Sequence, residues 1–123
     1  MDNTTFKQNL VRKGFELAKK TILLSDILPK KSSIQVINYQ LLRSATSIGA
    51  NIVEAQSASS KKDFANFLGY ALKSANETKF WLALLKETFL GETEAIQNLV
   101  NLTNELAKIL GSIIATLKGK RKF

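Results

Sequence analysis

The sequence predicts an all-α protein, an antiparallel four-helix bundle with up-down-up-down topology. Three observations favour this fold class. Helix breakers are scarce, because the 123 residues include one proline and six glycines. Apolar residues recur at spacings of three and four, which is typical of helical faces and not of strands. Short turn signals divide the chain into four segments, so neighbouring helices should be antiparallel within one domain, 1–123, that ends in a basic tail, 118–123.

The first helix is expected from about Thr5 to Leu24. Thr5 and Gln8 have the spacing of a capping box, and Pro29 interrupts the run. The residues that form its apolar face are Phe6, Leu10, Gly14, Leu17, Thr21, Leu24 and Leu28.

The second helix is expected from Ser32 to about Gln56, with Ser32 and Gln35 as another capping box. Its apolar face consists of Leu41, Ala45, Ile48, Ile52 and Ala55. Gly49 lies in the middle of this helix, where glycine costs about 1 kcal/mol relative to alanine. We therefore expect either a close approach of another backbone at Gly49 or a bend.

A third capping box, Ser60 with Asp63, begins a helix that should reach about Leu90, with Gly91 at its C′ position. The apolar face of this helix follows a heptad pattern: Phe64, Leu68, Ala71, Ala75, Thr78, Leu82, Leu85 and Phe89. The fourth helix should begin near Thr93 and end at Gly119. Its apolar face is Ile96, Leu99, Thr103, Leu106, Leu110, Ile113 and Leu117.

The third and fourth helices carry more apolar residues than one core face requires. The additional residues that we expect at an interface are Phe67, Phe80, Trp81, Leu84, Leu102 and Ile109. Self-association is the simplest form of such an interface. The alternative is that these side chains form the margin of a wide core.

Several function classes lack the residues that they need. The chain has no cysteine and no histidine, which excludes disulfides, a cysteine nucleophile, histidine-based triads and the usual zinc sites. No glycine-rich phosphate loop occurs. We expect no enzymatic activity, no cofactor and no bound metal. No secretory leader and no apolar stretch of about 20 residues is visible, so a cytoplasmic protein is expected.

A line of polar residues runs along the second helix and faces the third. It consists of Arg43, Ser47, Asn51 and Glu54, with Ser74 and Glu77 on the third helix. Glu54 and Glu77 could form a carboxylate pair for catalysis, but Arg43 nearby would neutralise them. The favoured interpretation is a hydrogen-bonded network that fixes the register of the two helices.

Positive charge exceeds negative charge by eight, with 18 Lys and Arg against 10 Asp and Glu. In an antiparallel bundle, one end should gather Lys61, Lys62, Lys118, Lys120, Arg121 and Lys122. Such a patch would neutralise nucleic-acid phosphates without reading base sequence. The alternatives are that the charge serves solubility alone, or that a basic helix lies on an anionic membrane surface.

The segment from Leu41 to Leu85 contains a set of short motifs. They are Arg43-Ser44, Ser47-Ile48, Asn51-Ile52, Glu54, Lys62-Asp63-Phe64, Ala71, Ser74 and Glu77. In these motifs the chain resembles the bundle proteins of the bacterial 23S ribosomal RNA intervening-sequence family. The resemblance implies a homopentamer without enzymatic activity. A related group acts as the accessory protein of diversity-generating retroelements and binds nucleic acid and a reverse transcriptase.

Together these observations predict a non-enzymatic, homo-oligomeric accessory protein that binds RNA or DNA through basic patches. The alternative is a protein-only adaptor that docks a larger partner through the apolar surface of the third and fourth helices.

Overall fold

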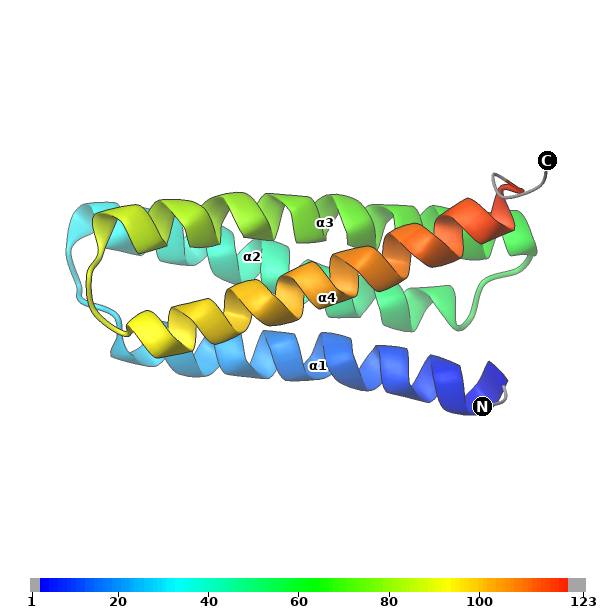
Figure 1. Cartoon of the computed structure of the whole chain (residues 1–123), viewed down its shortest axis with the longest axis horizontal. Coiled ribbons are helices and arrows are strands. Elements are labelled where there is room, and N and C mark those ends of the chain that lie inside the picture. Colours follow the sequence, from blue (N-terminus) through cyan, green and yellow to red (C-terminus); the bar gives the residue numbers. More distant parts are fainter. Residues whose placement is uncertain (1–2, 120–123) are drawn as a thin grey trace.

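A computed structural model of the chain describes residues 3–119. It contains four helices, which are α1 (Asn3–Ile27), α2 (Ser32–Ala55), α3 (Lys61–Thr88) and α4 (Thr93–Leu117). Each helix runs opposite to the one before it, so the predicted four-helix bundle is confirmed (Figure 1). The start of α1, the end of α4 and the α2–α3 connection lie at one end of the bundle, which we call the terminal end (Figure 1).

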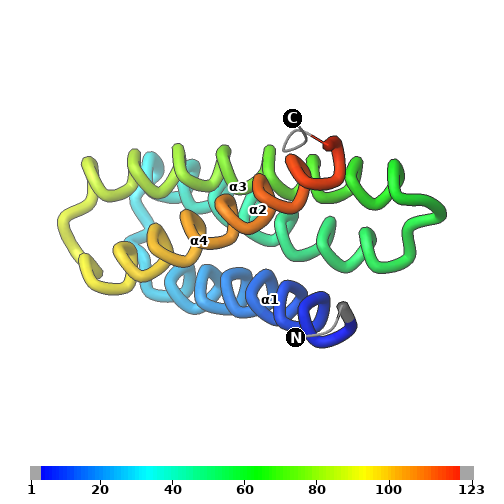
Figure 2. The backbone as a smooth tube through the Cα atoms, turned by 45° about the vertical axis from the view of Figure 1, so that its right-hand side comes forward, coloured from blue at the N-terminus to red at the C-terminus, as the bar shows by residue number. Residues whose placement is uncertain are grey.

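The predicted apolar faces form the core. The largest fully buried apolar side chains come from all four helices: Leu17, Leu41, Ile48, Ile52, Leu68, Leu82, Leu85, Ile96, Leu99, Leu106 and Leu110. Phe6 is an exception, because 40% of it is exposed. Figures 1 and 2 show why: α4 begins beside α1 but moves toward α3 as it approaches the terminal end. The first turn of α1 therefore lacks the cover that α4 gives the rest of the helix.

The starts of the helices only partly follow the predicted capping boxes. Ser60 is the N-cap of α3, and its Oγ accepts a hydrogen bond from the Asp63 backbone N–H at 3.0 Å, as predicted. At α2 the prediction is wrong. Lys31 takes the N-cap position, its carbonyl accepts the first helical hydrogen bond, and its side chain makes no capping bond. At α1 it is also wrong, since the helix begins at Asn3 and Thr5 lies inside it.

The α3–α4 connection differs from the prediction, whereas the end of α4 agrees with it. Gly91 does not have a left-handed backbone; α3 ends at Thr88, and the next residue, Phe89, is extended. The ring of Phe89 covers Gly91 so closely that an added Cβ would lie 2.5 Å from its Cζ. The left-handed residue is Glu92, with φ of 52°. Gly119 has φ of 71° just after α4, as expected for a helix-ending glycine.

Helices α1 and α2 lie close together at two glycines. A Cβ added to Gly14 would lie 3.0 Å from the Gly49 Cα, and one added to Gly49 would lie 3.1 Å from the Gly14 carbonyl oxygen. The expectation of a close backbone approach at Gly49 is therefore confirmed. This contact fixes the distance between α1 and α2 and leaves a groove on their outer side.

Candidate nucleic-acid interface

The two halves of the bundle differ in charge. We define the terminal half as residues 3–15, 44–74 and 105–119, which lie on the terminal-end side of the helix midpoints. It holds eight basic residues: Lys7, Arg12, Lys13, Lys61, Lys62, Lys73, Lys108 and Lys118. It holds three acidic residues: Glu54, Asp63 and Glu105.

The opposite half, residues 16–43 and 75–104, is almost balanced. It holds seven basic residues: Lys19, Lys20, Lys30, Lys31, Arg43, Lys79 and Lys86. It holds six acidic residues: Glu16, Asp26, Glu77, Glu87, Glu92 and Glu94. Nearly all of the positive excess of the described chain therefore lies in the terminal half.

The structure places three of the predicted phosphate-binding residues together at the terminal end. Lys61, Lys62 and Lys118 are exposed, and none of them forms an ion pair within residues 3–119. The other three, Lys120, Arg121 and Lys122, lie outside the described residues.

Two carboxylates of the terminal half already have partners. Glu105 forms an ion pair with Lys13 at 2.9 Å. Asp63 accepts hydrogen bonds from the backbone N–H and the hydroxyl of Ser59. Neither carboxylate pairs with the lysines at the end of the bundle, so those lysines can meet an external anion.

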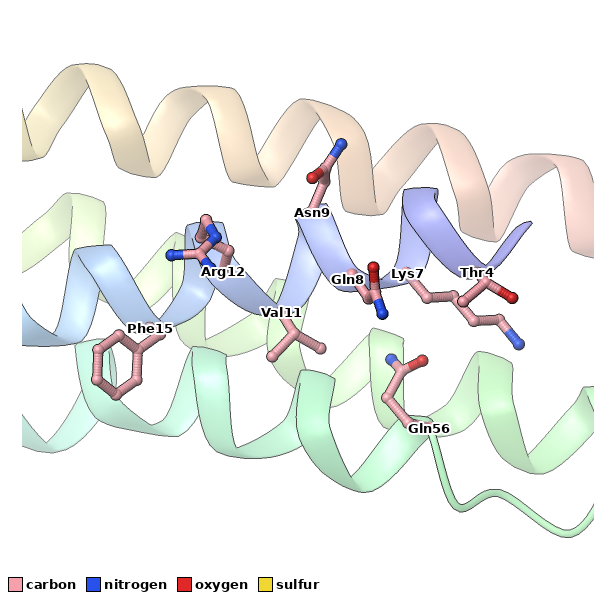
Figure 3. Close-up of a pocket in the computed structure, with 8 residues that line it drawn as sticks. All are labelled: Thr4, Lys7, Gln8, Asn9, Val11, Arg12, Phe15 and Gln56. Carbon is pink, nitrogen blue, oxygen red and sulfur yellow. The ribbon is translucent and has the colours of Figure 1, made fainter. Parts of the chain in front are cut away.

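Three connected hollows follow α1 toward the terminal end. The largest, of about 950 Å³, lies open along the first half of α1 (Figure 3). Its lining residues are Thr4, Lys7, Gln8, Asn9, Val11, Arg12, Phe15 and Gln56. Figure 3 shows Val11 and Phe15 extending from α1 toward α2, while Gln56 extends from the end of α2 toward α1.

The second hollow, of about 440 Å³, lies where α4 has moved away from α1. Its lining residues are Phe6, Lys7, Leu10, Ala55, Gln56, Ala58, Ser60, Lys61, Phe64, Ile113 and Leu117. The Lys7 Nζ atom lies 5.4 Å from the centroid of the Phe64 ring, a cation–π distance. This hollow joins the largest one, because Lys7 and Gln56 line both.

The third hollow, of about 230 Å³, is the outer groove of the glycine crossing. Its lining residues are Val11, Gly14, Phe15, Ala18, Thr46, Gly49, Ala50 and Val53. It shares Val11 and Phe15 with the largest hollow, and we call the three together the α1 trough. The lining residues of the α1 trough include three cations, Lys7, Arg12 and Lys61, and no carboxylate.

The polar line divides into separate local contacts. Arg43 forms an ion pair with Glu77, and the Glu77 carboxylate also accepts a hydrogen bond from the Trp81 indole at 2.9 Å. Ser47 and Asn51 donate to carbonyls of their own helix. The Ser74 carbonyl accepts a hydrogen bond from the Thr78 hydroxyl.

Glu54 does not join Glu77. Its side chain is exposed and makes no hydrogen bond or ion pair within the described part of the chain. It lies eleven residues beyond Arg43, the partner of Glu77, which is about 16 Å along α2. The structure therefore offers no carboxylate pair at these positions. Residues 3–119 also contain no group of three or more Asp and Glu side chains that could hold a metal ion, and no helix there is long and apolar enough to cross a membrane.

One buried contact between α2 and α3 was missed from the sequence. The Thr78 hydroxyl lies 2.9 Å from the Ser44 hydroxyl, and both residues are fully buried. Thr78 stands within the apolar face of its helix, and a hydroxyl in such a face needs a partner. This need of Thr78 for a hydrogen-bond partner is the feature of the sequence from which the contact could be predicted.

The predicted interface residues lie closer to the core than expected. Phe67, Trp81, Leu84, Leu102 and Ile109 are half-buried and pack against core side chains. Phe80 is 57% exposed and packs edge-on against Trp81. Most of the exposed large apolar side chains instead lie on α1 and α2: Phe6, Phe15, Ile22, Leu23, Ile27, Val36, Tyr39 and Val53.

The fold and its charge define the class of protein: a small helical bundle with a strongly basic end. A sequence model of the 23S rRNA-intervening sequence protein family matches residues 7–112, and the chain belongs to this family. The predicted family is thus confirmed.

A solved structure supports the same assignment. It is the crystal structure of a protein with unknown function from the S23 ribosomal protein family of Bacteroides thetaiotaomicron VPI-5482. That protein is 43% identical, the match covers 85% of this chain and 97% of that chain, and the TM-score is 0.78. No curated protein matches this chain. The family and the fold are therefore shared with a protein of unknown function, and neither assigns an activity.

Proposed function

We propose that this chain is a non-enzymatic accessory protein of the bacterial cytoplasm that binds RNA or DNA through the phosphate backbone. The observation that carries the proposal is the charge difference between the two halves, with eight basic and three acidic residues in the terminal half. Lysine side chains without acidic partners bind phosphates and release counterions, which favours association with any nucleic-acid sequence.

Self-association is part of this proposal, with the pentamer that the family resemblance implies. Exposed apolar side chains that do not line the α1 trough supply surface for contacts between copies, and they include Ile22, Leu23, Ile27 and Val36 together with Phe80 on α3. In a closed ring the copies are related by rotation, so their terminal ends would lie on the same rim. The basic patches of all copies would then act on one nucleic acid.

Binding to labelled duplex DNA and structured RNA across a salt series tests this function. The variant to compare with the parent protein is Lys61→Glu/Lys62→Glu/Lys118→Glu. We expect at least about tenfold weaker binding and a shallower salt dependence, since each lost phosphate contact to duplex DNA removes about 0.9 from the slope of log K against log salt. Light scattering on the same samples gives the number of copies.

A matched control separates position from total charge. Lys19→Glu/Lys20→Glu/Lys30→Glu changes the net charge equally, and all three residues are exposed in the opposite half. This control should bind much more tightly than the terminal-end variant. Equal losses in the two variants would refute a site at the terminal end.

The alternative is a protein-only adaptor that docks through α3 and α4. It has less support, because five of its six predicted contact residues pack against the core of the same chain. Absence of nucleic-acid binding by the parent protein at low salt would favour it over the proposed function.

A further inference from the structure

We infer that the α1 trough holds unpaired bases, so that the protein binds single-stranded nucleic acid in preference to a duplex. This inference rests on the proposed function and adds the class of ligand. Phosphate-binding lysines alone would hold a duplex and a single strand by the same means. A preference for the single strand requires surfaces that contact the faces of bases.

The α1 trough provides such surfaces. Phe15 is 64% exposed and Phe6 is 40% exposed, although α1 has a complete core-facing stripe without them. Aromatic rings that are open to solvent bind nucleobases by stacking, whatever the base. Phe6 and Phe15 are nine residues apart on one helix, about 13 Å along its axis and on opposite sides of it. A strand that follows the trough past Lys7 and Gln56, which line both hollows, can therefore place different bases on the two rings.

Cations lie close to these rings in the trough. Lys7 and Arg12 lie between Phe6 and Phe15 on α1, and Lys61 lines the trough from the start of α3. Proteins that bind single strands without sequence preference combine a basic groove for the backbone with aromatic rings for the bases. In a duplex the base faces are stacked on one another and cannot reach these rings, so only the cations would act.

The amide side chains of the trough suit base edges without selecting one base. Figure 3 shows Gln8 and Gln56 reaching into the largest hollow from α1 and α2. The Gln56 Nε2 donates to the Ile52 carbonyl at 2.8 Å, so its Oε1 atom can accept a hydrogen bond from a base. Amides offer both donors and acceptors, so each base finds a partner.

Charge argues against a second copy of this chain as the occupant of the trough. The trough contributes three cations and no carboxylate, and a second copy carries a net charge of +8. A polyanion is complementary to such a lining, whereas another strongly basic protein is repelled by it.

The test compares three labelled DNA ligands of equal length: a single strand, its duplex, and an abasic strand that has the sugar–phosphate backbone without bases. We expect the parent protein to bind the single strand more tightly than the other two. Phe6→Leu/Phe15→Leu removes both rings and keeps apolar side chains at two exposed positions. It should weaken single-strand binding by about tenfold and leave duplex and abasic binding within about twofold.

Tyr39→Leu is the matched control, since Tyr39 is 65% exposed on α2 and does not line the trough. It should leave binding of all three ligands unchanged. Circular dichroism confirms that each variant is folded.

The outcomes separate the inference from the proposed function. If no ligand binds at low salt, the proposed function fails and the inference fails with it. If all three ligands bind equally and the double variant has no effect, the proposed function stands and the inference is overturned. A double variant with lower mass by light scattering and unchanged single-strand affinity would show that the trough joins copies of the chain, which also overturns the inference.

Discussion

The contact between Gly14 and Gly49 gives the sharpest prediction about the stability of the bundle. Replacing either residue with alanine places a methyl group against the backbone of the other helix, 3.0 Å from the Gly49 Cα or 3.1 Å from the Gly14 oxygen. A flexible side chain could move aside, but here the neighbouring atoms belong to the backbone of a long helix. The two helices must therefore separate slightly, and their packed side chains must move with them.

The magnitude follows from two opposed effects. Replacing glycine with alanine inside a helix stabilises it by about 1 kcal/mol. Overpacking at a tight contact costs about 1–3 kcal/mol. Gly69 and Gly111 are matched controls, because both lie inside helices and an added Cβ would have no atom within 4 Å. We expect Gly69→Ala and Gly111→Ala to stabilise the protein by up to about 1 kcal/mol, and Gly14→Ala and Gly49→Ala to be about 1–3 kcal/mol less stable than these controls.

Urea unfolding followed by circular dichroism measures the difference. With a slope of about 1.5 kcal/mol/M, a difference of 2 kcal/mol moves the midpoint by about 1.3 M. The protein concentration must be equal in all samples, because association raises the apparent stability. If Gly14→Ala and Gly49→Ala unfold at the same urea concentrations as Gly69→Ala and Gly111→Ala, the close contact is not the reason for glycine at positions 14 and 49.

Three further predictions concern single side chains, each read out by the free energy of unfolding in urea. Glu92→Gly should stabilise the protein by about 0.5–1 kcal/mol, because glycine adopts the left-handed backbone of this position without the steric cost of a Cβ. Glu92→Ala keeps a Cβ and should give no such stabilisation. Equal stabilities of the two variants would contradict this explanation. Ser60→Ala should cost about 1 kcal/mol of stability, because it removes the N-cap hydrogen bond of α3. Ser32→Ala removes no capping bond and should change stability by less than about 0.5 kcal/mol. Similar losses in the two variants would count against the assigned caps. Glu77→Ala should cost less than about 1 kcal/mol of stability, since the ion pair between Glu77 and Arg43 is about half exposed. It should also shift the fluorescence emission of Trp81, the single tryptophan, because the indole loses its hydrogen bond to Glu77. A larger loss of stability would mean that this contact stabilises the bundle more than surface ion pairs do.

The number of helices and most of the core could be predicted from the sequence. The reason is that one residue pattern, apolar residues at spacings of three and four, specifies both the helix and its buried face. The buried positions of α3, from Leu68 to Leu85, follow that pattern without exception. The position of Lys61, Lys62 and Lys118 at one end follows from the same information, because four antiparallel helices with short connections fix which ends coincide.

The helix ends were harder to predict, since several residues compete for each cap. Ser32 and Gln35 have the spacing of a capping box, yet the chain after Pro29 places Lys31 at the N-cap. Gly91 is small because the Phe89 ring lies against it, and not because it ends α3 with a left-handed backbone. These outcomes depend on how the connection crosses the end of the bundle, which local spacing does not specify.

The α1 trough could not be predicted, because it arises from the direction of α4. Phe6 fits the apolar face of α1, and only the divergence of α4 from α1 leaves it exposed. The second apolar face of α1, with Val11, Phe15, Ala18 and Ile22 at spacings of four, three and four, was present in the sequence. The aromatic residues of α3 form a stronger sequence signal for an interface than this face does, although most of them pack against the core.

The distribution of charge carries more information about function than its total. A net charge of +8 keeps a protein soluble wherever the charges lie, and gathering them at one end adds repulsion that destabilises the folded chain. The near balance of the opposite half shows that the fold itself does not require basic side chains throughout, since the same four helices continue there. A polyanion bound at the terminal end, as proposed above, would relieve that repulsion. For this reason we compare two variants of equal net charge, one altered at Lys61, Lys62 and Lys118 and one altered in the opposite half. Different affinities of the two variants would indicate a binding surface, whereas equal affinities would indicate charge that serves solubility alone. A comparison of total charge cannot make this distinction.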